Sequence, residues 1–133
     1  MGLFAGEPIS KGTLIWQFVD GLDRYITDEE LAALPQNALD FVYFYYYRSK
    51  ICGQYVLLAD NDRFTNHSYE PNTGGIDSLF PRREGGIALR DIASGEELVC
   101  DYSSFDADFP IYAHLYPREL VRVSARVSRQ GKI

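Results

Sequence analysis

The alternation of apolar and polar residues predicts two strand-turn-strand units of similar pattern. Segment 2–15, GLFAGEPISKGTLI, places Gly and Pro between two apolar stretches, which is typical of two strands joined at a corner. Segment 86–99, GIALRDIASGEELV, repeats this spacing. The matching positions are Ala5, Ile9 and Gly12 in the first segment and Ala88, Ile92 and Gly95 in the second. We expect the same corner between strands in both segments, each with a buried Ile and a Gly at positive φ. The repeated pattern is too short to indicate a solenoid.

Between these units the pattern predicts one short helix and two further strands. Thr27 and Glu30 have the spacing of a capping box, so a helix should start there. It should run to about Leu34, because the following proline disfavours helical geometry at the residue before it. The aromatic run 41–47, FVYFYYY, has strong strand propensity, and 54–59 should return after a turn.

Towards the C-terminus the pattern predicts a hairpin and a helical turn. Glycine pairs at 74–75 and 85–86 flank a polar loop and indicate a hairpin. Segment 111–116 is apolar and aromatic and is expected to cover the core as a helical turn. Arginines then recur every four residues, so a helix there would present a basic stripe. Alternatively, the segment is simply a solvated helix face or a fraying tail. These arginines are Arg118, Arg122 and Arg126, while Arg82 and Arg83 lie in the hairpin loop.

Length and composition indicate one domain that is mainly β. The chain has 133 residues, of which 46% are hydrophobic, enough to bury a core in a single domain. Aromatic residues make up 14% and favour sheet. No stretch reaches the roughly 18 apolar residues of a membrane span, and no signal peptide opens the chain. We therefore expect a cytoplasmic protein with no membrane partner.

Net charge is −6, with an acidic body and a basic C-terminus. Residues 1–117 hold eight Lys or Arg against eighteen Asp or Glu, whereas 118–133 hold five against one. The acidic body argues against direct nucleic-acid binding and is compatible with a lysine-bearing protein or basic peptide as partner. It is equally compatible with a charge that only keeps the domain soluble. Oligomeric state does not follow from the sequence.

Cys52 and Cys100 are the only cysteines, and the chain has two histidines. This set makes neither a disulfide framework nor a four-ligand zinc site. We expect two reduced thiols and no bound metal.

Segment 63–72, RFTNHSYEPN, follows an apolar run and concentrates short polar side chains. These are Asn66, His67, Ser68 and Asn72. They could simply bond their own backbone in a turn, or they could hold a polar ligand, and NHS is also a formal glycosylation triplet. A second segment, 95–102, reads GEELVCDY. The pair resembles the SET-domain family of S-adenosylmethionine-dependent protein-lysine methyltransferases, whose signatures read RFxNHSCxPN and GEELxxDY.

The resemblance implies a SET-domain (β-clip) fold of several short sheets, with a pseudoknot of the C-terminal segment and one or two short helices. It would make 1–133 a single SET domain with a motif-bearing core at about 2–105. Segment 106–133 would then be an extension that closes the channel or forms a basic tail. The implied reaction moves a methyl group from S-adenosyl-L-methionine to a lysine ε-amine and leaves S-adenosyl-L-homocysteine.

The resemblance also assigns roles to residues. Tyr102 matches the catalytic tyrosine, and a second tyrosine before the NHS motif would line the lysine channel, with Tyr45 the first match and Tyr43 the next. The other tyrosines of this run are expected to be plain sheet packing. The implied cofactor-binding residues are Gly2, Phe4, Arg63, Phe64, Asn66, His67 and Tyr102. The implied channel residues are Tyr43, Tyr45, Cys100, Tyr102 and Tyr112, whereas Asn72, Glu97 and Asp101 are expected to be structural.

Departures from the family pattern refine these expectations. Tyr69 stands where many members have a zinc-binding Cys, and no Cys-rich segment follows Tyr102, so we expect no zinc and a compact, bacterial-like member. Met1 occupies the middle of the GxG cofactor loop, which keeps open a catalytically weak cofactor-binding or interaction module. A small β-rich protein without a cofactor is the third alternative. Cys100 stands where Phe or Tyr limits the number of methyl groups, which predicts a product beyond monomethyl-lysine.

Overall fold

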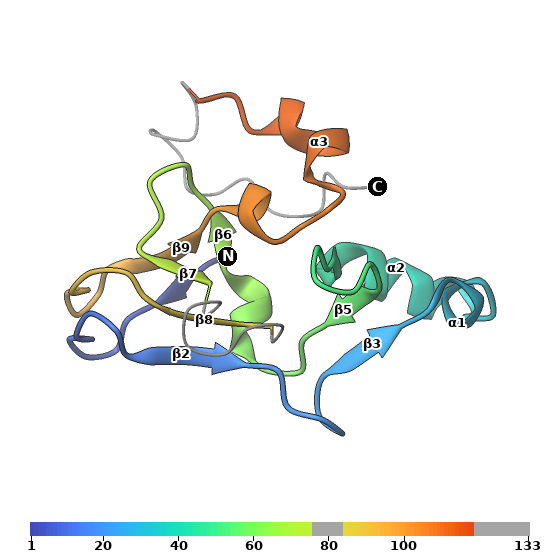
Figure 1. Cartoon of the computed structure of the whole chain (residues 1–133), viewed down its shortest axis with the longest axis horizontal. Coiled ribbons are helices and arrows are strands. Elements are labelled where there is room, and N and C mark those ends of the chain that lie inside the picture. The colour runs from blue at the N-terminus through green and yellow to red at the C-terminus, as the bar shows by residue number, and fades with distance from the viewer. Residues whose placement is uncertain (76–83, 119–133) are drawn as a thin grey trace.

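Within residues 1–75 and 84–118, which the computed structural model describes, the chain forms three sheets of three short strands each (Figure 1). The first sheet contains β1 (Leu3–Phe4), β9 (Glu97–Cys100) and β6 (Asn66–His67), in that order. The second contains β2 (Leu14–Gln17), β8 (Gly85–Ala88) and β7 (Thr73–Gly75). The third contains β3 (Arg24–Ile26), β5 (Tyr55–Leu57) and β4 (Tyr47–Arg48). The prediction of a mainly β fold of several short sheets is confirmed.

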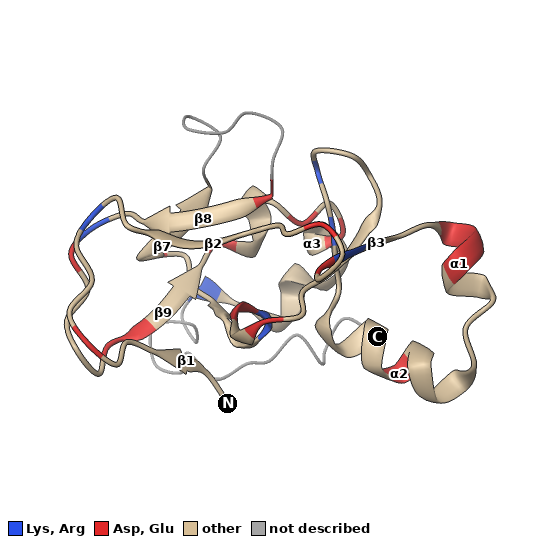
Figure 2. Ribbon diagram, turned by 90° about the horizontal axis from the view of Figure 1, so that it is seen from below, with Lys and Arg blue, Asp and Glu red and all other residues tan. Residues whose placement is uncertain are grey.

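Short helices connect or cover the sheets. They are α1 (Asp28–Ala32), α2 (Gln36–Tyr45), α3 (Phe109–Tyr112) and the 3-10 helices η1 (Asn61–Phe64), η2 (Tyr102–Ser104) and η3 (Ala113–Leu115). The capping box of α1 is confirmed, because Glu30 N donates to Thr27 Oγ1 at 3.1 Å and Thr27 N donates to the Glu30 carboxylate at 3.0 Å. The first turn of α1 is acidic (Figure 2). In the described part of the chain, none of these helices could cross a bilayer.

The prediction of a strand over 41–47 is wrong, because most of this run belongs to α2. Val42 and Tyr46 pack with Ile26 and Leu31 in one buried cluster, and they are spaced as on one face of a helix. Burial of this face overrides the strand propensity of the aromatic residues. The strand in this region begins only at Tyr47, the first residue of β4. It pairs antiparallel with β5, as expected for two strands joined by a turn.

The two similar corners pair with each other. Ile9 and Ile92 exchange both backbone hydrogen bonds, at 2.9 and 2.8 Å. Gly12 and Gly95 have φ values of 85° and 82°, which confirms the expected positive φ. Ile92 is fully buried in a cluster with Ala5, whereas Ile9 is only partly buried. The sequence echo therefore marks two halves of one packed unit.

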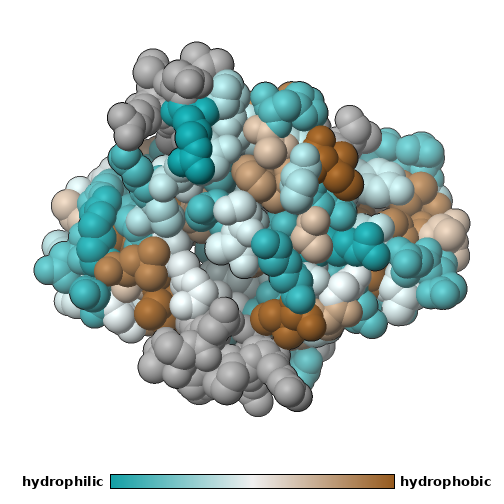
Figure 3. All heavy atoms as spheres, turned by 45° about the horizontal axis from the view of Figure 1, so that its top comes forward, coloured by the Kyte–Doolittle hydropathy of each residue, from teal (hydrophilic) through white to brown (hydrophobic). Residues whose placement is uncertain are grey.

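Two C-terminal expectations are confirmed. Strands β7 and β8 pair antiparallel as the predicted hairpin, and 109–115 forms the expected helical turns as α3 and η3. On the face shown in Figure 3, hydrophobic areas are small and separated by hydrophilic ones. The expectations for Arg82, Arg83, Arg122 and Arg126 lie outside the described residues.

Candidate functional site

Strand β9 brings the two sequence motifs together by lying between β1 and β6. It runs antiparallel to β1 and parallel to β6, with His67 opposite Cys100. The side chain of Asn72 fixes this strand, because Nδ2 donates to Glu97 O and Oδ1 accepts from Val99 N, both at 2.8 Å. The structural role predicted for Asn72 is confirmed. Residues 66–67 consequently lie beside 100–102, although they are distant in sequence.

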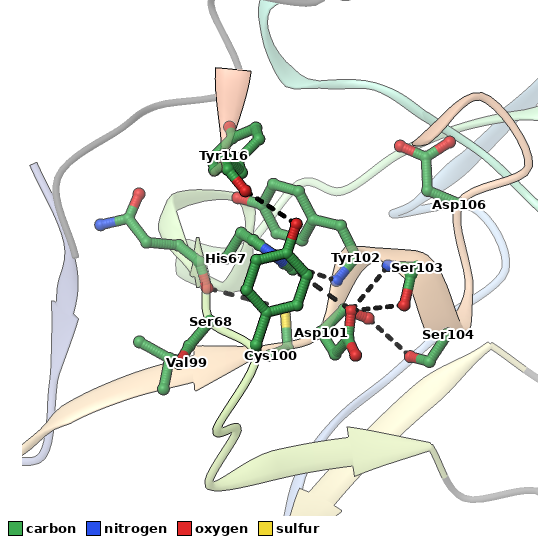
Figure 4. A network of polar contacts seen from close by, with 12 residues as sticks. His67, Ser68, Val99, Cys100, Asp101, Tyr102, Ser103, Ser104, Asp106 and Tyr116 are labelled. Atoms are coloured by element: carbon green, nitrogen blue, oxygen red, sulfur yellow. Dashed lines mark hydrogen bonds and ion pairs between the residues drawn. The ribbon is translucent and has the colours of Figure 1, made fainter. Parts of the chain in front are cut away.

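His67 and Tyr102 form the centre of this junction (Figure 4). Tyr102 N donates to His67 Nδ1 at 3.0 Å, and the His67 ring lies 5.1 Å from the Tyr102 ring. Burial lowers the pKa of His67, so the neutral imidazole that can accept this bond is favoured. Asp101 accepts from Ser103 N at 2.9 Å, which confirms that it braces the turn. The sequence did not indicate that the His67 side chain would hold the Tyr102 backbone.

Tyr102 and Asn66 line a common pocket of about 80 Å³, called here the small pocket. Its walls include the rings of Phe44, Tyr45 and Phe64. These residues come from the end of α2, from η1, from β6 and from the start of η2. The phenol and the amide that the motifs supply therefore face one cavity.

Polar groups around the small pocket are held in fixed positions. Asn66 Nδ2 donates to Met1 O at 3.0 Å and to Glu97 Oε1 at 2.8 Å. A side chain at position 2 would clash, because a Cβ on Gly2 would lie 2.5 Å from Glu97 Oε1. The Arg63 guanidinium lies 4.3 Å from the Phe64 ring centroid, and its Nε is buried with no hydrogen-bond partner in the described part of the chain.

A second pocket of about 340 Å³, called here the large pocket, is lined by Tyr47, Cys100 and Glu84 among others. Thr65 lines both pockets. Tyr102 Oη donates to Thr65 O at 2.6 Å, so the phenol oxygen lies beside a residue that both pockets share. The two pockets thus share Thr65, and the hydroxyl of Tyr102, which lines the small pocket, is bonded to its carbonyl.

Several residues implied by the family resemblance lie elsewhere. Tyr43 lines neither pocket and contacts Tyr46, with ring centroids 5.9 Å apart. Phe4 is 58% exposed in β1 and lies outside the small pocket. Tyr112 is buried in one cluster with Tyr102 and lines neither pocket. Tyr45 lines the small pocket rather than the large one, on the helix that replaces the expected strand.

Tyr47 is the tyrosine that the sequence reasoning missed. It is fully buried, lines the large pocket and donates from Oη to Glu84 Oε2 at 2.9 Å. The helical spacing of the apolar residues in α2 could have indicated it. A helix over 36–45 leaves Tyr47 as the first residue of the strand that follows. Thr65, the variable residue of the motif, was missed for a different reason: it lines both pockets because of its position, which its side-chain chemistry does not indicate.

Metal ligands do not gather in the part of the chain that the structure describes. No group of three or more His, Cys, Asp or Glu side chains there could hold a metal ion. The expectation of a zinc-free protein stays a prediction.

Known proteins resemble this chain in sequence pattern and in fold. The family model for the SET domain matches residues 1–103. No curated protein sequence matches the chain significantly. A solved structure of apo ctPRC2 with two mutations in Ezh2 has a TM-score of 0.56 at 23% identity, over 80% of this chain and 14% of that one. Autoinhibited ctPRC2 bound to S-adenosylmethionine has a TM-score of 0.56 at 19% identity, over 91% and 15%. The chain thus spans about one seventh of these chains, and the likeness concerns the fold.

Proposed function

Because this chain belongs to the SET-domain family, we propose that it transfers a methyl group from S-adenosylmethionine to the ε-amine of a lysine in a protein substrate. The observation that carries the proposal is the position of Tyr102. Its ring lines the small pocket with Asn66, and its hydroxyl is bonded to Thr65, which also lines the large pocket. A donor in one pocket and an acceptor in the other would meet at this hydroxyl.

The residues of the small pocket fit the sulfonium end of S-adenosylmethionine, since a volume of about 80 Å³ holds only part of that molecule. S-adenosylmethionine, when bound, supplies an electrophilic methyl group on a cationic sulfur. Phe44, Tyr45 and Phe64 line this pocket, and the face of an aromatic ring attracts a cation. Arg63 Nε is a buried donor without a partner among the described residues, as a carboxylate ligand would require. Asn66 supplies an amide at the same pocket.

The large pocket fits a lysine side chain. Its buried inner residues include Tyr47, Thr73 and Glu84, and its Glu84 carboxylate favours entry of a cationic amine. The amine must then lose its proton to water before methyl transfer, since free lysine has a pKa of about 10.4. An adjacent sulfonium lowers that pKa. The Tyr102 oxygen, whose proton is donated to Thr65 O, would accept an N–H of the neutral amine and so orient its lone pair. In-line geometry then depends on Tyr102 and Thr65 holding the two reactants in register.

Cys100 bears on the number of methyl groups added. Its side chain lines the large pocket, where a Phe or Tyr would occupy more space. We therefore expect products beyond monomethyl-lysine. Mass spectrometry at excess cofactor tests this, and exclusive monomethylation would contradict it.

Methyl transfer is tested with the purified chain, labelled S-adenosylmethionine and a panel of lysine peptides. Calorimetry with S-adenosylmethionine and S-adenosylhomocysteine measures binding separately. Transfer that disappears in Tyr102→Phe while cofactor binding persists would support the proposal. Binding without transfer in the wild type would favour a catalytically weak module, and no binding would contradict both.

A further inference from the structure

The large pocket has acidic side chains in its interior and a basic side chain at its mouth. Its acidic residues are Glu84, which is 4% exposed, and Asp62, which is partly buried. Lys50 and Ser104 line the same pocket but are exposed, so they form its mouth. Among the described lining residues, Lys50 is the one cation.

The interior carboxylates are already engaged in hydrogen bonds. Glu84 accepts from Tyr47 Oη at 2.9 Å and from Ser49 Oγ. Asp62 accepts from Thr65 Oγ1 at 3.1 Å. The bond to Asp62 holds negative charge close to Thr65, where a target amine would end, and those to Glu84 fix a second carboxylate in the same pocket.

Lys50 is held at the mouth by the backbone of the segment after Tyr102. Its N–H donates to Phe105 O at 3.0 Å, and its Nζ donates to Ser103 O at 2.6 Å. An ammonium has three donors, so two remain for a ligand. No carboxylate of the described residues lies within ion-pair distance of Lys50. Its charge is therefore positioned but not neutralised by a neighbouring carboxylate.

We propose that Lys50 makes the enzyme select a target lysine that has an acidic residue beside it. The inference rests on the proposed function of the large pocket. When the target lysine points inward to the carboxylates, its sequence neighbours lie at the mouth beside Lys50. A Glu or Asp there gains an ion pair, whereas a Lys or Arg is repelled. This narrows the expected partner from a generally basic peptide to an acid-flanked lysine.

The experiment uses three peptides that differ only in having Glu, Gln or Lys on both sides of one lysine. We measure kcat/KM and, separately, binding by fluorescence anisotropy. The Glu peptide should exceed the Gln peptide by about two- to fivefold, in the range of an exposed ion pair, and the advantage should shrink at high salt. Equal values for all three peptides would overturn the inference.

Variants assign the preference to one residue. Lys50→Glu should reverse the order of the peptides, and Lys50→Arg should keep it. Lys11→Glu is the matched control, because it changes net charge equally on an exposed turn that lines neither pocket. A preference that survives Lys50→Glu, or that Lys11→Glu abolishes equally, would contradict the inference. If no peptide is methylated, the proposed function fails, while the binding preference still decides the role of Lys50.

Discussion

The small and large pockets share Thr65 but are built in different ways. Most of the small pocket comes from the motif segment 63–66, Tyr102 and the aromatic end of α2. The large pocket collects residues from strands, turns and loops spread over the chain, including charged ones. Under the proposed function, the motifs would set the chemistry of the methyl donor, whereas the choice of substrate would depend mainly on residues outside the motifs. Of the residues that line the large pocket, the motif segments contain only Thr65 and Cys100.

The boundary between the pockets should be the most sensitive position. Tyr102→Phe removes the hydroxyl that donates to Thr65 O, and kcat should fall about 100-fold or more. Tyr112→Phe is the control, because Tyr112 is also buried in the same cluster but lines neither pocket. Steady-state kinetics of both variants test this. Equal losses in the two would mean that Tyr102 acts only through packing.

The two asparagines of the motif should separate binding from stability. Asn66→Ala removes an amide from the small pocket, so cofactor affinity should fall about tenfold, in the range of one lost polar contact. It also removes the donor to Met1 O and Glu97 Oε1, but both of these residues are accessible to solvent, so the loss of stability should be the smaller of the two variants. Asn72→Ala leaves Glu97 O and Val99 N without partners and should lower the free energy of unfolding by about 2–4 kcal/mol. Calorimetry and denaturant unfolding measure these effects, and exchanged results would contradict the assignment.

His67 should make the junction acid-sensitive. Burial lowers its pKa below the ordinary 6.5, so the unfolded chain binds a proton that the folded chain does not. Folding stability is therefore complete above about pH 6.5 and falls as pH drops through that value. Asp101 opposes this shift and Arg118 adds to it, both less than burial does.

The measurement is urea unfolding between pH 5 and 8 for the wild type and His67→Gln. Gln does not titrate in this range, so the variant should lose this part of the pH dependence. His114→Asn is the control at an exposed histidine and should retain it. An unchanged profile in His67→Gln would show that other groups cause the acid sensitivity.

The smallest effects should come from two tyrosines that lie on different pockets. Tyr47→Phe removes the donor to Glu84 and should raise KM for peptide a few-fold without changing cofactor affinity. Tyr45→Phe changes a wall of the small pocket and should do the reverse. Peptide titrations at saturating cofactor and calorimetry distinguish the two. If both variants change the same constant, the separation of the pockets is wrong.

Local signals in the sequence determined several features of this protein. The capping box at Thr27, the glycines of the paired corners and the motif segments act over a few residues, so their outcome is readable without the fold. The motifs also predicted that Asn66 and Tyr102 would share a pocket. The cytoplasmic location and the single-domain extent of 1–133 stay predictions.

Tertiary structure alone decided which tyrosines reach the site. The aromatic run fits a strand by propensity, but burial against Ile26 and Leu31 makes it a helix and moves Tyr43 away from both pockets. Tyr47, which follows the helix, packs in another cluster with Val56 and Leu58 and lines the large pocket. Long-range contacts also placed Lys50 beside Ser103. Such contacts join segments far apart in the chain, and no local pattern carries that information.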